Sequence, residues 1–338
     1  MLDSPARPHG ASYSCVRFHP MLLVCPGLTA HADACATRPP LARLAFYAEP
    51  PIVDADGIAL RTCRTLGLAA QAPLAALTAA GVGVDTRDDY WLLADPVTLV
   101  PGRTDVALEG QVRDLTDEQT HELLMALNAH FVDDGVTFMA PRHDLWLAHL
   151  AVPPEITTTP LDRARTGPLA EALPRGDDAP QWRRWQDEIQ MLLHNHPVNA
   201  ARESAGASPA NAVWFWGGGR RADAGTLPLL DVNAPENALG DLLRGISVSA
   251  RAAAPPGASS TRVFVHTPIR DADDVDGFID RVLEPALAVL EHDAGATLDL
   301  VADGAGAAVA WHARAPSAVR RWASRWRARP LQVPSITA

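Results

Sequence analysis

The sequence predicts an α/β protein whose parallel or mixed sheet is flanked by helices on both faces and which carries a small inserted α+β unit. Two observations support this fold class. From residue 181 onward, short apolar stretches typical of strands alternate with helical patterns, as in sheets covered by helices on both faces. Between residues 90 and 151, strand-like stretches instead flank a single helix, which is typical of a compact α+β unit.

We therefore expect two nested domains. Residues 1–89 and 176–338 are predicted to form the α/β core, residues 90–151 the inserted subdomain, and residues 152–175 a turn-rich connector. The length of 338 residues agrees with this division, since a domain contains roughly 150 residues.

The N-terminal part of the core is predicted to contain one strand followed by helices. Met21–Cys25 is a short apolar run that Pro26 and Gly27 end, as expected for a buried strand. Two prolines at residues 39–40 are typical of a helix start. Helices are expected over residues 39–47, 59–68 and 73–80.

The inserted unit is predicted from a capping signal and from apolar strand patterns. Thr116 and Gln119 have the spacing of a capping box, at the start of a helix that continues to about Phe131. Asp95-Pro96 is expected to break one strand-like region in two. Strands are expected over residues 90–94, 97–100, 136–139 and 145–150.

The C-terminal part of the core begins with a long helix that Pro180 opens. Pro285 lies near the middle of a later helix and predicts a kink there. Helices are expected over residues 181–193, 237–249, 274–293 and 317–327, and strands over residues 212–216, 262–266, 297–302 and 307–313.

The charge of the chain excludes several kinds of function. Its 40 acidic and 29 basic residues give a formal net charge of −11, and every basic side chain is arginine. A chain without lysine cannot use a P-loop lysine, a Schiff-base lysine or a lysine general base. The negative charge argues against general nucleic-acid binding, and the mean hydropathy of −0.03 is not that of a membrane protein.

The cysteines predict a reducing compartment. Cys15, Cys25, Cys35 and Cys63 show no CxxC spacing and lie among apolar residues, so we expect buried thiols rather than a disulfide or zinc set. The apolar run before Pro26 is too short for a membrane span or a strong signal peptide. We therefore expect a cytoplasmic protein.

A polar cluster after the long helix is the first candidate for a ligand site. Asn199 and Arg202 are three residues apart and would share one face of a helical turn. An arginine with amide side chains beside a glycine turn suits a carboxylate or a phosphate. In the alternative interpretation, the asparagines cap backbone groups, the arginine pairs with a carboxylate and the glycines merely turn. The candidate residues are His196, Asn199, Arg202, Asn211, Gly217, Gly218 and Gly219.

This cluster resembles a segment of the archaeal-type cofactor-independent phosphoglycerate mutases. In that segment a His-Pro-x-Asn-x-x-Arg run, here residues 196–202, precedes an Asn-x-x-Trp-x-Trp-Gly strand and turn, here residues 211–217. The chain is more similar still to a bacterial family of mutase-related proteins that includes the regulatory protein RpfE, over residues 41–330. The resemblance implies an alkaline-phosphatase-like α/β core that carries an inserted α+β domain.

The resemblance also implies two divalent cations with Asp and His ligands and a Ser or Thr nucleophile. This chain departs from that pattern. Its first strand ends in Cys25 instead of an Asp-Gly pair, the Thr-Pro-Leu-Glu nucleophile segment is absent, and Phe278 and Gly304 stand where ligand histidines are expected. A partial cation site would use His266, Asp271 and Asp303.

We therefore expect a mutase-like protein with a degenerate metal site, acting without a cofactor as a regulatory or small-anion-binding protein. Its ligand would be a small phosphorylated or carboxylated metabolite; a protein partner is also compatible, whereas nucleic acid and membrane are not expected. The first alternative is an active phosphoglycerate mutase or phosphatase that depends on Mn or Mg. The second is a protein-interaction module that uses the inserted domain.

Overall fold

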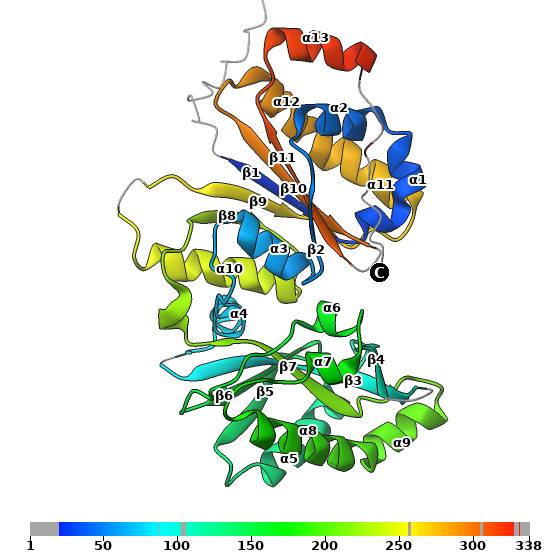
Figure 1. Cartoon of the computed structure of the whole chain (residues 1–338), viewed down its shortest axis with the longest axis vertical. Coiled ribbons are helices and arrows are strands. Elements are labelled where there is room, and N and C mark those ends of the chain that lie inside the picture. Colours follow the sequence, from blue (N-terminus) through cyan, green and yellow to red (C-terminus); the bar gives the residue numbers. More distant parts are fainter. Residues whose placement is uncertain are drawn as a thin grey trace, which may run out of the picture.

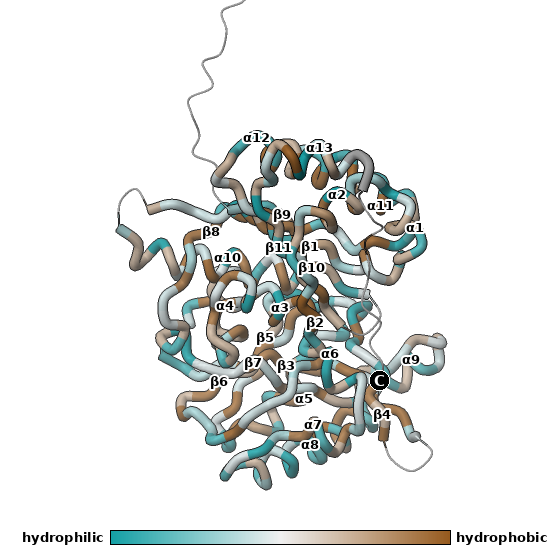
Figure 2. Tube along the Cα trace, turned by 45° about the horizontal axis from the view of Figure 1, so that its top comes forward, coloured by the Kyte–Doolittle hydropathy of each residue, from teal (hydrophilic) through white to brown (hydrophobic). Residues whose placement is uncertain are grey.

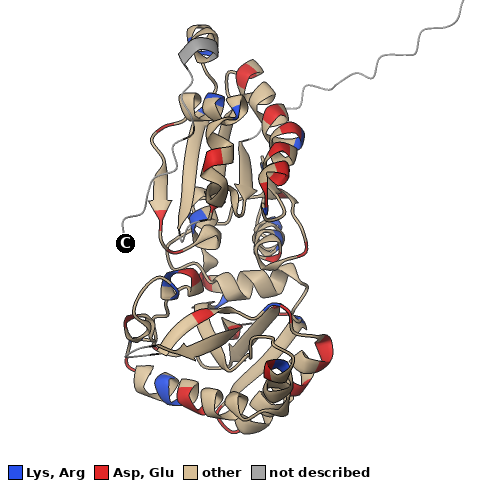
Figure 3. Cartoon of the chain, turned by 90° about the vertical axis from the view of Figure 1, so that its right-hand side faces the viewer, with Lys and Arg blue, Asp and Glu red and all other residues tan. Residues whose placement is uncertain are grey.

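The computed structural model of the chain describes residues 20–86, 88–102, 106–255, 258–304, 307–327 and 331. These residues form two sheets that lie one above the other, with helices between them and on both outer faces (Figure 1). Apolar residues are concentrated along the strands and the inner faces of the helices (Figure 2), and acidic and arginine residues are interspersed over both layers (Figure 3). Among the described helices, none is long and apolar enough to cross a bilayer.

The first sheet has six strands in the order β2-β11-β10-β1-β9-β8. The pairs β1–β10, β1–β9 and β8–β9 are parallel, whereas β11 is antiparallel to both of its neighbours. The expected mixed sheet is therefore confirmed. Its strands are β1 (Met21–Cys25), β2 (Ile52–Asp54), β8 (Leu230–Asn233), β9 (Thr261–Val265), β10 (Thr297–Asp303) and β11 (Ala308–Arg314).

The second sheet is antiparallel, and β3 lies at its centre. One edge of β3 pairs with β6 and then with β4, and the other edge pairs with β7. β3 runs through Asp95-Pro96 without the predicted break. The strands are β3 (Tyr90–Pro101), β4 (Val106–Gln111), β5 (Val136–Arg142), β6 (Leu145–Leu150) and β7 (Ala212–Gly219).

The position of β7 corrects one expectation. The alternation of strands and helices assigned residues 212–216 to the α/β core, but the structure pairs this strand with β3 in the second sheet. Phe215 packs into the apolar cluster on the outer face of that sheet, and Trp214 packs into a smaller cluster beside β4. Local periodicity identifies a strand but not its partner, which is selected by these tertiary contacts.

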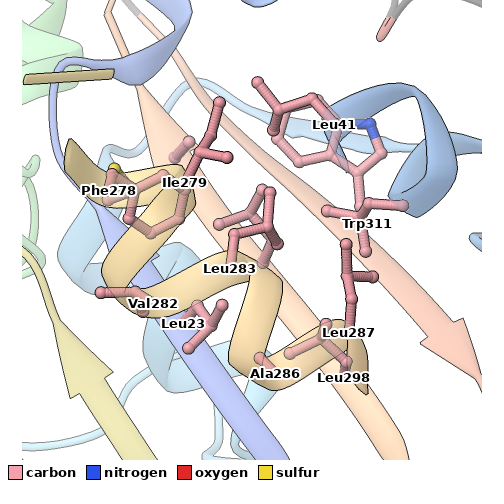
Figure 4. Close-up of a cluster of buried hydrophobic side chains, with 14 of the residues drawn as sticks. Leu23, Leu41, Phe278, Ile279, Val282, Leu283, Ala286, Leu287, Leu298 and Trp311 are labelled. Atoms are coloured by element: carbon pink, nitrogen blue, oxygen red, sulfur yellow. The ribbon is translucent and has the colours of Figure 1, made fainter. Parts of the chain in front are cut away.

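The outer face of the first sheet is covered by α1 (Ala32–Ala36), α2 (Pro39–Tyr47), α11 (Ala272–Phe278), α12 (Glu284–His292) and α13 (Ala318–Arg327). Leu283 and Leu287 pack there against Trp311 and Leu298 of the sheet (Figure 4). A π-helical turn, Ile279–Leu283, joins α11 to α12 just before Pro285. The wider turn accommodates a residue that cannot donate a backbone hydrogen bond.

The layer between the sheets consists of α3 (Ile58–Thr65), α4 (Leu74–Gly81) and α10 (Ala238–Arg251). One apolar cluster extends through this layer, from Val24 of the first sheet to Leu93 of the second. α4 and α10 approach each other at backbone distance: a Cβ on Gly245 would lie 1.7 Å from the Leu77 carbonyl oxygen. The inner faces of the two sheets therefore share one apolar cluster.

The outer face of the second sheet is covered by α5 (Asp117–His130), α8 (Ala179–His194) and α9 (Pro197–Ser204). The predicted capping box of α5 is present, with Thr116 Oγ1 accepting from the Gln119 backbone N–H. Two short helices, α6 (Leu161–Ala164) and α7 (Leu169–Ala172), lie beside β4. Single 3-10 turns cover Leu28–His31 and Arg221–Ala224.

The thiols within the described residues are buried and free, as expected for Cys25, Cys35 and Cys63. Burial raises the pKa of Cys35 to about 11 and that of Cys63 to about 12, so both remain protonated at neutral pH. Cys15 lies outside the described residues.

Candidate functional site

Asn199 is a buried structural residue of α9, with 2% of its surface exposed. Its Nδ2 donates to the carbonyl oxygens of Leu193 (2.7 Å) and Ala210 (3.0 Å), and its Oδ1 accepts from the Ala210 N–H (2.8 Å). All these partners are backbone groups. The side chain therefore fastens the end of α8 to the segment that leads into β7.

Arg202, one turn along α9, is also buried, with 4% of its surface exposed. Its Nη2 lies 2.6 Å from Asp114 Oδ1, its Nε donates to the Ser208 carbonyl oxygen (2.9 Å), and its Nη1 donates to Gln119 Oε1 (3.0 Å). Each guanidinium nitrogen thus already has a protein acceptor, which leaves little capacity for a ligand.

His196 and Asn211 also bind backbone. His196 is the N-cap of α9, where Nδ1 accepts from the Val198 N–H at 3.3 Å. Asn211 bonds both backbone groups of Leu99, at 2.8 and 2.9 Å, and so aligns β7 with β3. These contacts match the alternative interpretation of the polar cluster.

The three glycines at the end of β7 lie apart from those four side chains. Gly217, Gly218 and Gly219 line a cavity of about 550 Å³, whereas His196, Asn199, Arg202 and Asn211 do not. The structure therefore does not bring the seven candidates to one cavity.

The candidate cation ligands lie near the carboxyl ends of the parallel strands. Asp303 Oδ1 accepts from the Gly27 N–H at 2.7 Å, and Asp271 caps α11 by accepting from the Asp274 N–H at 2.9 Å. The His266 ring packs edge-on against Phe278, with centroids 5.5 Å apart. Within the described part of the chain, no three His, Cys, Asp or Glu side chains are placed to hold a metal ion, so the partial site is not assembled.

The residues present do not fit the two-cation site that the resemblance implies. A Cβ on Gly304 would lie 2.1 Å from the Ala30 backbone nitrogen and 2.6 Å from Thr29 Oγ1, so the backbone leaves no room for a histidine. Phe278 is fully buried in the apolar core. Both expected histidine positions are thus filled by packing.

Asp303 does, however, line a cleft between the first sheet and the segment that contains α6. The cleft has a volume of about 280 Å³, and its other lining residues include Gly57, Asp162 and Arg165. Burial is the main cause that raises the pKa of Asp303, and the neighbouring Asp162 raises it further. Burial likewise raises the pKa of Asp162.

A second hollow of about 690 Å³ adjoins this cleft and shares Glu109 and Arg165 with it. It adds Arg113, whose Nε donates to Gln111 Oε1 at 2.9 Å. Arg165 forms no side-chain hydrogen bond or ion pair with any of the described residues. Arg165 is therefore a guanidinium that can bind an anion, and the two hollows together form what we call the arginine cleft.

The buried carboxylate of Asp95 is linked to Arg113 through Gln111. Asp95 accepts from Trp216 Nε1 (2.6 Å) and from Gln111 Nε2 (2.9 Å), and Gln111 in turn accepts from Arg113. Burial raises the pKa of Asp95 to about 6. Gln111 thus connects a group that titrates below neutral pH to an arginine of the cleft.

Sequence reasoning missed Arg113 and Arg165. They are 52 positions apart in the sequence and meet only because β4 and α6 are neighbours in the fold. The one available signal was the lack of lysine, which requires any cationic ligand group to be arginine.

Comparison with known proteins locates the similarity. The family model described as 2,3-bisphosphoglycerate-independent phosphoglycerate mutase matches residues 74–199. The mutase of Methanosarcina barkeri is 27% identical over 239 residues, which cover 62% of this chain and 58% of that protein. The mutase of Methanothrix thermoacetophila is 37% identical over 100 residues, covering 28% of this chain and 25% of that protein. The chain is phosphoglycerate-mutase-like.

A third relative is a probable mutase of Geobacter sulfurreducens, 27% identical over 236 residues, which cover 66% of the mutase-like chain and 57% of that protein. The chain therefore spans less than two thirds of each of these relatives. Among solved structures, a cofactor-independent mutase of Thermoplasma acidophilum aligns with a TM-score of 0.38 and 17% identity, covering 88% of this chain and 90% of that one. A protein of Pyrococcus horikoshii aligns with a TM-score of 0.44 and 14% identity, covering 88% and 87%.

The segment that the family model matches contains the arginines of the cleft but not the candidate cation ligands of the first sheet. Residues 74–199 include Arg113, Asp162 and Arg165 of the arginine cleft. They do not include His266 or Asp303, which lie near the strand ends of the first sheet.

Proposed function

We propose that this mutase-like chain binds a small phosphorylated or carboxylated molecule in the arginine cleft and does not transfer phosphoryl groups through metal ions. The observation that carries the proposal is Arg165, whose guanidinium forms no hydrogen bond or ion pair with the described residues and acts only electrostatically on Asp162, in a cleft that Arg113 also lines. Arginine binds phosphate and carboxylate through paired N–H donors.

The charges of the cleft favour a particular orientation of such a ligand. Its anionic group would lie toward Arg113 and Arg165, away from the Asp303 carboxylate at the strand end. Asp162 and Asp303, whose pKa values burial raises, can accept hydrogen bonds from ligand hydroxyls. A small acid that also carries hydroxyl groups suits both halves of the cleft.

The non-catalytic part of the proposal rests on packing at the strand ends. Gly304 is pressed against Ala30, and Phe278 is enclosed in the core, so neither position can supply a cation ligand without rebuilding the backbone. We therefore derive no reaction step through metal ions.

The same proposal includes the fold and family of the chain, its role and its location. We regard the first sheet and its helices as an alkaline-phosphatase-like core and the second sheet as the inserted unit, in the bacterial family that includes RpfE. We include a regulatory role, with a protein partner that responds to the bound ligand, because the proposed site binds a ligand without metal chemistry. A cytoplasmic location is supported by the free, buried thiols of Cys25, Cys35 and Cys63.

The binding test compares 3-phosphoglycerate, glycerate and inorganic phosphate by isothermal titration calorimetry. We expect Arg165→Gln to weaken 3-phosphoglycerate binding about tenfold, since a charge-assisted hydrogen bond contributes about 1.5–3 kcal/mol. Arg184→Gln removes an exposed arginine of α8 and serves as the matched control. Binding of none of the three compounds, or equal affinities in both variants, would contradict the proposal.

The catalytic test measures bound metal and the conversion of 3-phosphoglycerate to 2-phosphoglycerate after incubation with Mn²⁺. We expect substoichiometric metal and no turnover above the buffer rate. Stoichiometric metal together with turnover would establish an active mutase instead, and would overturn the non-catalytic part alone.

A further inference from the structure

The cavity at the end of β7 is a second hollow of ligand size, separate from the arginine cleft. Its volume is about 550 Å³, within the usual range of about 300–1,000 Å³ for small-molecule sites, and it shares no lining residue with the cleft. The end of β7, Tyr90, the loop at residues 69–72 and the connector at residues 156–160 enclose it.

A β-bulge exposes backbone polar groups in this cavity. Leu93 pairs with Trp216 and Trp91 pairs with Gly219, so Gly217 and Gly218 together face the single residue Leu92. Gly217 has a φ of +66°, a conformation that favours glycine. The extra residue of a bulge leaves its N–H and C=O without ladder partners, and here it lines the cavity.

Two aromatic side chains provide flat walls. Trp216 is held by the hydrogen bond from its Nε1 to the buried Asp95, at 2.6 Å. Tyr90 lies against the bulge, because a Cβ on Gly218 would lie 2.3 Å from its Oη. Trp216 is therefore held by a contact outside the cavity, and Tyr90 lies against the bulge that lines it.

The cavity at the end of β7 differs from the arginine cleft in the charged groups that line it. Asp223 is the one charged residue among those that line it, and no arginine does so. Asp223 Oδ2 accepts from the Arg220 N–H at 3.0 Å, which leaves Oδ1 available to a ligand donor. Burial raises the pKa of Tyr90, and the negative charge of Asp223 raises it further.

We propose that this cavity binds an uncharged or cationic heteroaromatic compound that carries an amino group. Such a ring would lie against Trp216 and Tyr90, and its amino group would donate to Asp223. A phosphate group would find no cationic partner and would face a carboxylate. The site is therefore specific for a different chemical class from the anion of the arginine cleft, and the two proposals are independent.

The probes are adenosine and cytidine, which carry a ring amino group, and inosine, in which an oxygen replaces the amino group of adenosine. We expect adenosine or cytidine to bind by calorimetry, and adenosine to bind about tenfold more tightly than inosine. Asp223→Asn should abolish most of the difference between adenosine and inosine, because it removes the charged acceptor but preserves the shape of the site.

A blocking variant separates loss of the site from loss of the fold. Ala70→Trp places a large ring on an exposed position of the cavity wall and should abolish binding of every probe, while 3-phosphoglycerate binding in the arginine cleft and the near-UV circular dichroism stay as in the wild type. Asp187→Asn, an exposed acid on α8, should change nothing. Failure of both adenosine and cytidine to bind the wild type, or undiminished binding to Ala70→Trp, would overturn the proposal.

Discussion

The family model of the mutases matches the two sheets unequally. The family model matches residues 74–199, which supply four strands of the second sheet and the arginines of the cleft. The strand ends of the first sheet, where the resemblance implies cation ligands, are instead filled by the close approach of Gly304 to Ala30 and by the buried Phe278. A family match over one sheet therefore gives no information about the chemistry at the strand ends of the other.

Two arginines also differ from each other: Arg165 lies within the region that the family model matches, and Arg202 lies just beyond it. Arg202 is buried and fully occupied by Ser208, Asp114 and Gln119, whereas Arg165 lines a cleft without a described partner. Arg202 lies on α9, and Arg165 directly follows α6. An arginine whose donors are all paired with protein acceptors stabilises the fold, whereas an arginine with unpaired donors can bind a ligand.

The largest expected effect tests whether the two sheets form one cooperative unit. Gly245→Ala should lower the free energy of unfolding by about 3 kcal/mol, because the added methyl group would overlap the Leu77 carbonyl oxygen and separate α10 from α4. Chemical denaturation monitored by tryptophan fluorescence measures this change. Gly167→Ala is the matched control, since its Cβ would meet nothing within 4 Å. Equal stability of the two variants would show that the layers are not joined at this contact.

The next effect concerns the buried carboxylate of the second sheet. The folded-state pKa of Asp95, about 6, lies above the ordinary value of 3.8, so the folded chain binds more protons than the unfolded chain between these values. The Asp95 contribution to stability should therefore fall as pH rises from about 4 to about 6, by about 3 kcal/mol at 1.36 kcal/mol per unit.

Asp95→Asn should remove that pH dependence. The measurement is the difference in unfolding free energy between wild type and variant at pH 4, 5, 6 and 7, because the difference cancels the titration of other carboxylates. A difference that does not change with pH would mean that Asp95 titrates at its ordinary value.

The smallest of these effects tests whether Arg202 is a structural residue and not a ligand-binding one. Arg202→Ala should cost about 2–3 kcal/mol of stability, since it removes the hydrogen bonds from the buried guanidinium to the Ser208 carbonyl oxygen and to Gln119. Its affinity for 3-phosphoglycerate should remain that of the wild type. Chemical denaturation measures the stability and isothermal titration calorimetry below the melting temperature measures the affinity, with Arg184→Ala as the control. Loss of affinity without loss of stability would show instead that Arg202 on α9 binds the anion.

Prediction from sequence succeeded where a local signal exists. Met21–Cys25, the Thr116–Gln119 capping box and the helix that Pro180 opens all have such signals, and all were confirmed. Three strands, β2, β4 and β8, and the continuity of β3 were not predicted. β2 has three residues within a segment rich in Pro, Asp and Gly, and β3 continues through Pro96 because neighbouring strands hold it on both edges.

The candidate site was less accessible to sequence reasoning. Motif spacing drew attention to Asn199 and Arg202, whose roles are structural, because a polar cluster beside glycines has the same composition whether it binds a ligand or backbone. Arg113 and Arg165 have no motif, and only the neighbouring positions of β4 and α6 bring them together.

The sequence by itself determined the α/β class, most of the helices and strands, the resemblance to mutases and the absence of lysine chemistry, because these depend on residue type and local periodicity. The tertiary structure alone decided that β7 joins the second sheet, that Gly304 is closed by backbone contact and that Arg165 has no hydrogen bond or ion pair with the described residues. Those features depend on which surfaces meet across long sequence separations, and such contacts leave no local pattern in the chain.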